Sequence, residues 1–407
     1  MRFAAALAQP GLRAIAEVKR RSPSAGDLRP DADPAQLAAQ FAGAGAAAIS
    51  VLVDERFAGT IDDLRAARAA TDAPLLGKGF FSTEVELREL RDAGADAILL
   101  ILRDLDDATA ARLLAYTEEL GIDALVEAHD ADELQRAMQL DAPVIGINAR
   151  DLTTFAIDRR VQLDLVARAP RDRLVIAESG VHTRAQGAAA ELAGADAILV
   201  GSALMQAPDP QAKLRELLSR PLVKVCGLTR QEDVDAAVEA GADLLGFILV
   251  ERSPRRAREV LDVPETALSV AVFVEDTEET RADLIQFYPD DGGTVRGREA
   301  TLLRDGREVA RVLDEPWQDR DPAHWSAAAA AAGRVVLAGG LGPENVRAAI
   351  AAVQPWAVDA ASSLEREPGI KDPERVRAFV EAARDGRRLD GARQGAEVPA
   401  WPAPERR

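Results

Sequence analysis

The sequence predicts an α/β fold in which parallel strands alternate with helices, and in residues 1–217 this pattern repeats often enough to close a (β/α)₈ barrel. One observation is a recurring motif, found as AGADAILL (93–100), AGADAILV (193–200) and AGADLLGFIL (240–249). In each copy a helix ends at glycine, Ala-Asp turns the chain and an apolar strand begins. These strands are apolar on both faces, as in a parallel sheet covered by helices.

Eight strands are expected in the first half of the chain, and amphipathic helical stretches separate them. They cover residues 14–20, 47–54, 74–80, 97–103, 123–129, 144–150, 174–180 and 197–204. A doubly wound open sheet is the alternative. Eight regular units without a GxGxxG motif after the first strand favour the barrel. The pattern of strand, loop, helix and strand then restarts at residue 222.

Composition limits the class of function. The chain has 407 residues, 47% of them hydrophobic, and a net charge of −18. This charge argues against a general nucleic-acid binder but leaves a small anionic substrate open. The single cysteine, Cys226, excludes an intramolecular disulfide and fits a reducing compartment. The opening apolar run is too short for a secretory signal, and no run reaches membrane-spanning length. We therefore expect a cytoplasmic enzyme that binds neither nucleic acid nor a membrane.

Polar residues stand at the end of nearly every strand of the first barrel. In such a barrel the carboxyl ends of the strands form one mouth, where catalysis takes place. A single polar residue there is usually a solvated group at a loop entrance, but this convergence favours an active site. Strand alternation also puts Glu17, Lys19 and Arg21 on one face. The strand-end residues are Glu17, Lys19, Lys78, Glu127, His129, Asn148, Arg150, Glu178, Ser179, Gly201 and Ser202.

A phosphate site is expected at the same mouth. ESG (178–180) follows the seventh strand and VGS (200–202) ends the eighth. Barrels often bind phosphate there through backbone N–H groups. Ser22, after the first strand, adds a hydroxyl group.

A family resemblance covers residues 1–217. The motifs IAEVKRRSPSAG, ISVLVDERFAGT, PLLGKGF, LVEAHD, IGINARDLTTFAID, IAESGV and ADAILVGSALM occur in the order typical of indole-3-glycerol-phosphate synthase. The resemblance implies closure of 1-(2-carboxyphenylamino)-1-deoxyribulose 5-phosphate to an indole, with loss of carbon dioxide and water. It implies no cofactor and no metal ion.

The resemblance also assigns roles to residues. It implies that Lys78 is the general acid, that Lys19 pairs with the substrate carboxylate, and that Glu127 is the base in the dehydration. Further matches are Glu17 as a second catalytic carboxylate, Asn148, Arg150 and Ser179 as substrate-orienting groups, and Ser22, Gly180, Gly201 and Ser202 as the phosphate cradle. Family members usually carry a further helix before the first strand, and they have Lys-Asp-Phe where this chain has Lys78, Gly79 and Phe80.

The second half resembles another family. LVKVCGLTRQEDVDAAVEAGADLLGFIL (222–249) is similar to the opening of phosphoribosylanthranilate isomerase. That enzyme performs an Amadori rearrangement and supplies the substrate of the synthase. The resemblance implies that Cys226 is the general base and that Arg255 meets the anthranilate. Its other substrate-binding matches are Gly339, Gly340, Asp359 and Ser362.

The middle of the second half departs from this family, because it is shorter than a standard barrel needs. Tyr288 stands in place of a histidine, and β-rich runs on both sides of Asp305–Gly306 predict a hairpin. The resemblance implies a general acid in a Phe-Asp-Trp motif. The nearest match, AHW (323–325), puts His324 there, and Asp314 and Asp319 are the rival candidates.

The sequence therefore predicts two consecutive (β/α)₈ TIM barrels, the second shortened and irregular in its middle. We expect a synthase barrel over 1–217, an isomerase-like barrel over 218–384 and a disordered tail over 385–407. The predicted function is bifunctional, in tryptophan biosynthesis, by a monomer acting on small phosphorylated anthranilates. The alternatives are a catalytically silent second domain and a different sugar-phosphate enzyme on the same fold.

Overall fold

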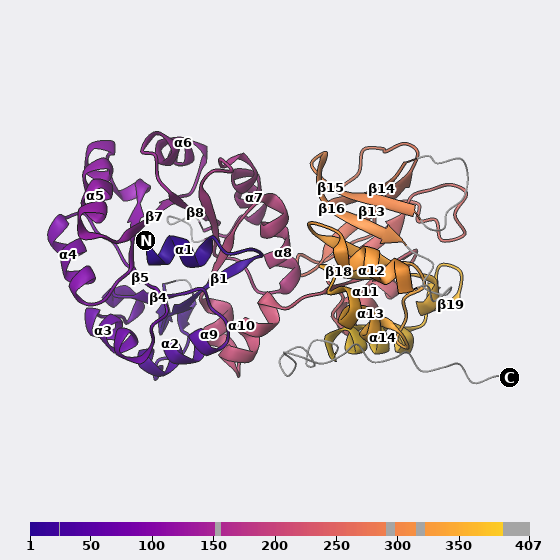
Figure 1. Cartoon of the computed structure of the whole chain (residues 1–407), viewed down its shortest axis with the longest axis horizontal. Coiled ribbons are helices and arrows are strands. Elements are labelled where there is room, and N and C mark those ends of the chain that lie inside the picture. Colours follow the sequence, from indigo (N-terminus) through magenta and orange to yellow (C-terminus); the bar gives the residue numbers. More distant parts are fainter. Residues whose placement is uncertain (24, 151–155, 290–297, 315–321, 386–407) are drawn as a thin grey trace. The chain divides into compact units, whose positions relative to one another are not determined.

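The computed structural model of this chain describes residues 1–407 except 24, 151–155, 290–297, 315–321 and 386–407. It divides into two compact units, residues 1–218 and 219–407. Each unit contains one closed barrel of eight strands (Figure 1), which confirms the predicted fold class. The expected disordered tail lies, from residue 386 onward, outside the described residues.

The eight strands of the first barrel coincide with the eight predicted stretches. Every neighbouring pair is parallel, and the pairing of the last strand with the first closes the barrel. The strands are β1 (Arg13–Val18), β4 (Ala48–Leu52), β5 (Leu75–Lys78), β6 (Ala97–Ile101), β7 (Asp123–Ala128), β8 (Val144–Asn148), β9 (Leu174–Glu178) and β10 (Ala197–Val200).

Helices surround this barrel (Figure 1) and bury their apolar faces against its outer surface. They are α2 (Pro34–Gly43), α3 (Ile61–Ala70), α4 (Glu84–Asp92), α5 (Asp107–Leu120), α6 (Ala131–Gln139), α7 (Arg159–Arg168), α8 (Arg184–Ala193), α9 (Ser202–Gln206) and α10 (Pro210–Leu218). Helix α1 (Arg2–Leu7) closes the end opposite the mouth. Its Phe3 and Leu7 are fully buried in the barrel interior, and the Ala4 N–H donates to Asp123 at the start of β7 (3.2 Å).

The recurring AGAD motif has a structural explanation. Its glycine takes a positive φ at the end of the helix, 106° at Gly94 and 118° at Gly194, which glycine adopts without strain. Its aspartate then accepts a hydrogen bond from a backbone N–H of the neighbouring strand, so two strands are joined at the closed end of each barrel. The pairs are Asp96 with Leu75 (2.9 Å), Asp196 with Val175 (2.8 Å) and Asp243 with Val223 (2.8 Å).

The second barrel has an antiparallel strand in its middle. Strand β15 runs antiparallel to both neighbours, and Asp305 (φ 49°) and Gly306 (φ 74°) form the turn of the predicted hairpin. An antiparallel strand returns the chain without a crossover helix, so the barrel closes with fewer residues. The strands are β11 (Leu222–Cys226), β12 (Leu244–Ile248), β13 (Leu268–Val274), β14 (Leu284–Tyr288), β15 (Arg298–Arg304), β16 (Arg307–Asp314), β17 (Val335–Ala338) and β18 (Ala357–Ala360).

The remaining elements are short or lie on the outside. The helices of the second unit are α11 (Gln231–Ala240), α12 (Pro322–Ala330), α13 (Val346–Val353) and α14 (Pro373–Asp385). Two small hairpins are β2 (Arg21–Ser22) with β3 (Gly26–Asp27), and β19 (Glu365–Glu367) with β20 (Ile370–Lys371). In the described part of the chain, no helix is long and apolar enough to cross a membrane.

The aspartate contacts at the closed end predict a stability effect. Asp196→Ala leaves the Val175 N–H without this acceptor, and we expect the free energy of unfolding to fall by about 1–3 kcal/mol. Urea denaturation of the full chain measures it. Asp172→Ala, in the exposed loop before β9, is the control and should change stability by less than about 0.5 kcal/mol. Equal effects of the two substitutions would contradict this role for Asp196.

Candidate active sites

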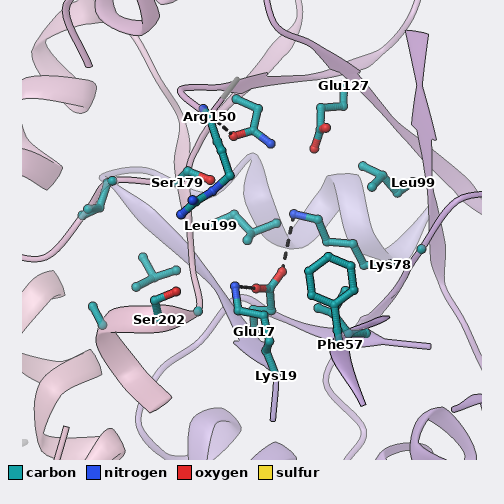
Figure 2. Close-up of a pocket in the computed structure, with 18 of the residues that line it drawn as sticks. Glu17, Lys19, Phe57, Lys78, Leu99, Glu127, Arg150, Ser179, Leu199 and Ser202 are labelled. Carbon is teal, nitrogen blue, oxygen red and sulfur yellow. Dashed lines mark hydrogen bonds and ion pairs between the residues drawn. The ribbon is translucent and has the colours of Figure 1, made fainter. Parts of the chain in front are cut away.

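A pocket open to solvent lies at the carboxyl ends of the strands of the first barrel (Figure 2). Every residue of the first half to which the resemblance assigns a role lines this pocket, except Ser22, which is buried in β2. The candidates brought together are Glu17, Lys19, Lys78, Glu127, Asn148, Arg150, Ser179, Gly180, Gly201 and Ser202.

Glu17 is buried between two lysines (Figure 2). The Nζ atom of Lys19 is 2.7 Å from its Oε1, and the Nζ atom of Lys78 is 3.4 Å from its Oε2. Burial alone would raise the pKa of Glu17, but the charges of Lys19 and Lys78 outweigh it and lower the pKa. Glu17 is therefore ionised at neutral pH.

Lys78 connects Glu17 to a second buried carboxylate. Its Nζ atom is 2.7 Å from Oε2 of Glu178, which is fully buried at the end of β9. Burial alone would lower the pKa of Lys78, but the charges of Glu178, Glu17 and Glu127 together raise it. Lys78 therefore stays protonated, and it carries a proton that it can donate into the pocket.

Glu127 and Glu178 form a pair of carboxyl groups on either side of β8. Gly146 of β8 lies between them, because a Cβ atom there would be 2.1 Å from Oε1 of Glu178. Burial raises the pKa of Glu178 to about 8, and the neighbouring Glu127 adds to the rise against the attraction of Lys78. Burial would raise the pKa of Glu127 too, but His129 and Lys78 hold it at about 2. One proton is thus shared unequally between two carboxyl groups.

Glu178 is a site residue whose role the sequence did not reveal. It was visible as an acidic residue at the end of an apolar strand, in ESG. Its contacts with Lys78 and Glu127 depend on the absence of a side chain at Gly146, which the strand pattern does not show.

The loops after β8 and β9 complete one side of the pocket. The side-chain oxygen of Asn148 accepts a hydrogen bond from the backbone N–H of Arg150 (3.0 Å). Ser179 (φ 67°) and Gly180 (φ 72°) are both left-handed, which is uncommon for serine. Arg150 and Ser179 lie on the same side of the pocket in Figure 2.

Gly201 lies directly against the charged groups. A Cβ atom at this position would be 2.4 Å from Oε1 of Glu17 and 3.1 Å from Nζ of Lys19, so a larger residue would displace these two charged groups. The expectation that Arg21 shares the face of Glu17 is wrong. Strand β1 ends at Val18, and Arg21 pairs with Asp27 across an exposed hairpin instead.

An apolar wall faces the charged groups. The rings of Phe57 and Phe80 are stacked with their centroids 6.5 Å apart, and the Arg56 guanidinium lies 3.7 Å from the Phe80 centroid. Phe57, Phe80, Leu99 and Leu199 line the pocket. A flat aromatic ring fits beside such a wall.

A chain of hydrogen bonds runs across the mouth of the second barrel. The buried Lys224 donates from Nζ to Asp359 Oδ2 (2.6 Å) and to Gln286 Oε1 (2.9 Å). The Gln286 amide donates to the Tyr288 hydroxyl (2.8 Å), which donates to Asp314 Oδ2 (3.0 Å). The chain thus joins side chains of β18, β11, β14 and β16.

Cys226 lies beside this chain at the end of β11, and its side chain is nearly buried. Burial raises the pKa of the Cys226 thiol, while the charge of Lys224 acts in the opposite direction. A Cβ atom at Gly246 would be 2.6 Å from the Cys226 sulfur, so the neighbouring strand leaves space for the thiol.

The other candidates of the second barrel lie on several elements. Arg255 forms an ion pair with Glu365 (2.8 Å), which also binds the buried Lys371 (2.9 Å). Gly339 (φ 101°) and Gly340 (φ 77°) follow β17, and Ser362 begins a short 3₁₀ helix after β18.

The structure describes in full only one of the three candidates for the general acid. Asp314 is the last residue of β16 and is bonded to Tyr288. His324 is in the first turn of α12, but its side chain, like all of Asp319, lies outside the described part of the chain.

Among the described residues, no cluster of three or more His, Cys, Asp or Glu could hold a metal ion.

Comparisons with known proteins identify two families. The profile described as indole-3-glycerol phosphate synthase matches residues 1–217, and that of N-(5'-phosphoribosyl)anthranilate (PRA) isomerase matches residues 323–382. Indole-3-glycerol phosphate synthase 2 of Streptomyces coelicolor is 48% identical over 217 residues, 53% of this chain and 84% of the relative. A multifunctional tryptophan biosynthesis protein of Schizosaccharomyces pombe is 31% identical over 450 aligned positions, 91% of this chain and 59% of the relative. The crystal structure of TrpF from Jonesia denitrificans is 27% identical and covers 41% of this chain and 98% of its own, with a TM-score of 0.34.

The raised pKa of Glu178 predicts a pH-dependent stability. A carboxyl group whose pKa is raised on folding contributes stability below pH 4.5 that is lost as the pH rises through about 8. We expect the free energy of unfolding to fall less over this interval in Glu178→Gln than in the wild type, by on the order of a few kcal/mol. Urea denaturation at several pH values measures it. The exposed Glu118→Gln is the control, and parallel curves for wild type and Glu178→Gln would contradict the assignment.

Proposed function

Because the chain belongs to the indole-3-glycerol phosphate synthase family, we propose that the pocket of the first barrel closes 1-(2-carboxyphenylamino)-1-deoxyribulose 5-phosphate to indole-3-glycerol phosphate. Carbon dioxide and water leave in this reaction. One observation carries the proposal: the protonated Lys78 lies between Glu17 and Glu178, in the pocket that the ionised Glu127 also lines. An acid and a base are thus held in one pocket.

Lys78 acts in the ring closure. The aromatic carbon that bears the carboxylate attacks the ketone carbon, and the Lys78 ammonium donates a proton to the developing alkoxide. Loss of the carboxylate as carbon dioxide then leaves its electron pair in the ring and restores aromaticity, so no external electron sink is needed. Glu17 and Glu178 stabilise the ammonium and hold it in position.

Glu127 acts in the dehydration. Loss of the hydroxyl group as water requires one proton on the leaving oxygen and removal of another from the ring-closed intermediate. Glu127, ionised in spite of its burial, removes the second proton. The first comes from Lys78, after the protonated Glu178 2.7 Å away has replaced the proton that Lys78 gave up in the ring closure.

The rest of the pocket binds the two ends of the substrate. Phe57 and Phe80 offer a face to the anthranilate ring, and Lys19 attracts its carboxylate. We assign the phosphate to the loops after β9 and β10, with Gly180, Gly201 and Ser202 in contact. Ser22, which the resemblance adds to this cradle, does not line the pocket. Asn148, Arg150 and Ser179 orient the sugar between the two ends.

Substitution of the acid or the base tests this assignment. Lys78→Ala and Glu127→Gln should each lower turnover of the carboxyphenylamino substrate by about 10²–10⁴-fold. Appearance of indole absorbance in the full chain measures it, and the thermal unfolding of each variant reports whether the fold is kept. The exposed Glu119→Gln is the matched control for the loss of one carboxylate. Near wild-type turnover in either pocket variant would overturn the proposal.

For the second barrel we propose the Amadori isomerisation of N-(5-phosphoribosyl)anthranilate, as the match to its family supports. An acid protonates the ring oxygen of the aminosugar, which opens to an iminium ion, and a base removes the proton from the adjacent carbon. The enolamine so formed rearranges to the ketone, the substrate of the synthase. We assign Cys226 as the base, with Arg255 and the Gly339–Gly340 turn as binding groups.

We assign Asp314 as the acid. It is the last residue of β16, at the same mouth as Cys226 at the end of β11. The Tyr288 hydroxyl holds its carboxyl group, and Gln286 and Lys224 extend this contact to Asp359 beside the thiol. The chain of hydrogen bonds fixes the acid and the base relative to each other without the loop that the shortened barrel lacks.

A fluorescence assay on the full chain tests these roles. A Lys78→Ala background stops the synthase, so that loss of anthranilate fluorescence reports the isomerase alone. In it, Cys226→Ala and Asp314→Asn should each lower turnover by about 10²–10⁴-fold. Asp305→Asn, in the turn at the other end of the same hairpin, is the matched control.

Two results would contradict this assignment. No isomerase activity in a folded Lys78→Ala chain would favour a silent second domain. Activity that survives Asp314→Asn but is lost in His324→Ala would make His324 the acid. We also propose that the enzyme works as a monomer in the cytoplasm, where its single cysteine stays reduced.

A further inference from the structure

A buried histidine stands behind the pocket of the first barrel. His129 directly follows β7, and only 2% of its side chain is exposed. It is not among the residues that line the pocket, whereas its neighbour Glu127 is. Any effect of His129 on the reaction must therefore pass through Glu127.

The hydrogen bonds of the ring fix the position of one proton. The Nδ1 atom of His129 is 2.9 Å from Oε2 of Glu133 in α6, and the His129 backbone N–H donates to the same oxygen (2.8 Å). Arg103 binds the other oxygen of Glu133 (3.3 Å). Glu133 is thus an ionised acceptor, so Nδ1 carries a hydrogen and donates it.

The second ring nitrogen faces Glu127. Nε2 is 3.2 Å from Oε1 of Glu127, at an angle that makes the contact an ion pair rather than an aligned hydrogen bond. With Nδ1 already protonated, a neutral ring would turn a lone pair toward a carboxylate, which is repulsive. The contact is favourable only when Nε2 is also protonated and the ring carries a positive charge. Burial would lower the pKa of His129, but Glu127 and Glu133 raise it to about 9, so the ring is a cation at neutral pH.

This cation makes the two neighbouring carboxyl groups different. Lys78 is 2.7 Å from Glu178, and by itself it would favour the charge on Glu178 and leave the shared proton on Glu127. A protonated Glu127 is no base. His129 contacts Glu127, and its positive charge reverses this preference.

We propose that His129 is a positioning residue of the synthase reaction, which places the negative charge of the Glu127–Glu178 pair on Glu127 and so makes Glu127 the base. The inference rests on the proposed synthase function and adds to it a residue and a reason for the division of roles. Five titratable groups surround His129 directly or through one neighbour: Glu127, Glu133, Arg103, Lys78 and Glu178.

The pH dependence of turnover distinguishes this role from a structural one. In His129→Gln the cation is absent, so the proton moves to Glu127 and returns to solution only at higher pH. We expect kcat at neutral pH to fall by about 10²-fold and to recover partly as the pH rises, with KM unchanged because His129 is outside the pocket. The control is Asp132→Asn, which removes an exposed carboxylate beside Glu133 in the first turn of α6. This variant should keep the wild-type dependence of kcat on pH.

Histidine NMR measures the charge of the ring directly. The chain has three histidines, so the resonance that is missing in His129→Gln identifies His129. In the wild type it should titrate at about pH 9, and in Glu133→Gln at a lower pH, because one of its two carboxylates is neutral. A wild-type titration at the ordinary value of 6.5 would overturn the proposal.

The outcomes also separate this inference from the proposed function. Substantial turnover in Glu127→Gln would show that Glu127 is not the base. It would overturn both the proposed synthase mechanism and the role of His129. If Glu127→Gln is inactive but His129→Gln has the wild-type pH profile, the role of His129 alone would be overturned. A loss of kcat in His129→Gln that is equal at every pH would do the same, because it would indicate a structural role.

Discussion

The arrangement of the first site depends on one constraint, which is that charges buried at the mouth of a barrel must be paired. Glu17 and Glu127 are ionised and almost fully buried, and either charge alone would cost several kcal/mol in such a place. The positive charge of Lys78 acts on both and makes their burial possible. The same pairing prepares the chemistry, because it keeps a proton on the lysine and holds the ammonium group still before the substrate arrives.

The second barrel meets this constraint with other residues. Lys224 is buried against Asp359, and Lys371 is buried against Glu365. Gln286 and Tyr288 extend the first pair to Asp314 through further hydrogen bonds. A polar chain of this kind holds each of its side chains in one position. The side chains at the mouth of the second barrel thereby stay in fixed positions, although the middle of this barrel is shortened.

Much of this structure could be predicted from the sequence, and the failures have physical reasons. The eight strands of the first barrel and the hairpin at Asp305–Gly306 were predicted from apolar runs and turn residues. These signals depend only on residues that are close in the sequence. Arg21 was misplaced because alternation ends where the strand ends, at Val18. The role of Glu178 was missed because its partners come from strands that only barrel closure brings near, past a glycine with no side chain. Contacts of this kind depend on the closed fold and leave no local signal.

The antiparallel strand explains how the second barrel can lose residues and still close. In a parallel barrel each crossover helix only returns the chain to the closed end. Strand β15 makes this return itself and also takes a place in the barrel between β14 and β16. Because β15 begins at the mouth and ends at the closed end, its carboxyl end is lost from the mouth. The mouth thus receives the carboxyl ends of seven strands instead of eight, and β16, which carries Asp314, becomes the strand end next to Tyr288 of β14. The shortening that removes one strand end therefore also brings the tyrosine and the aspartate together.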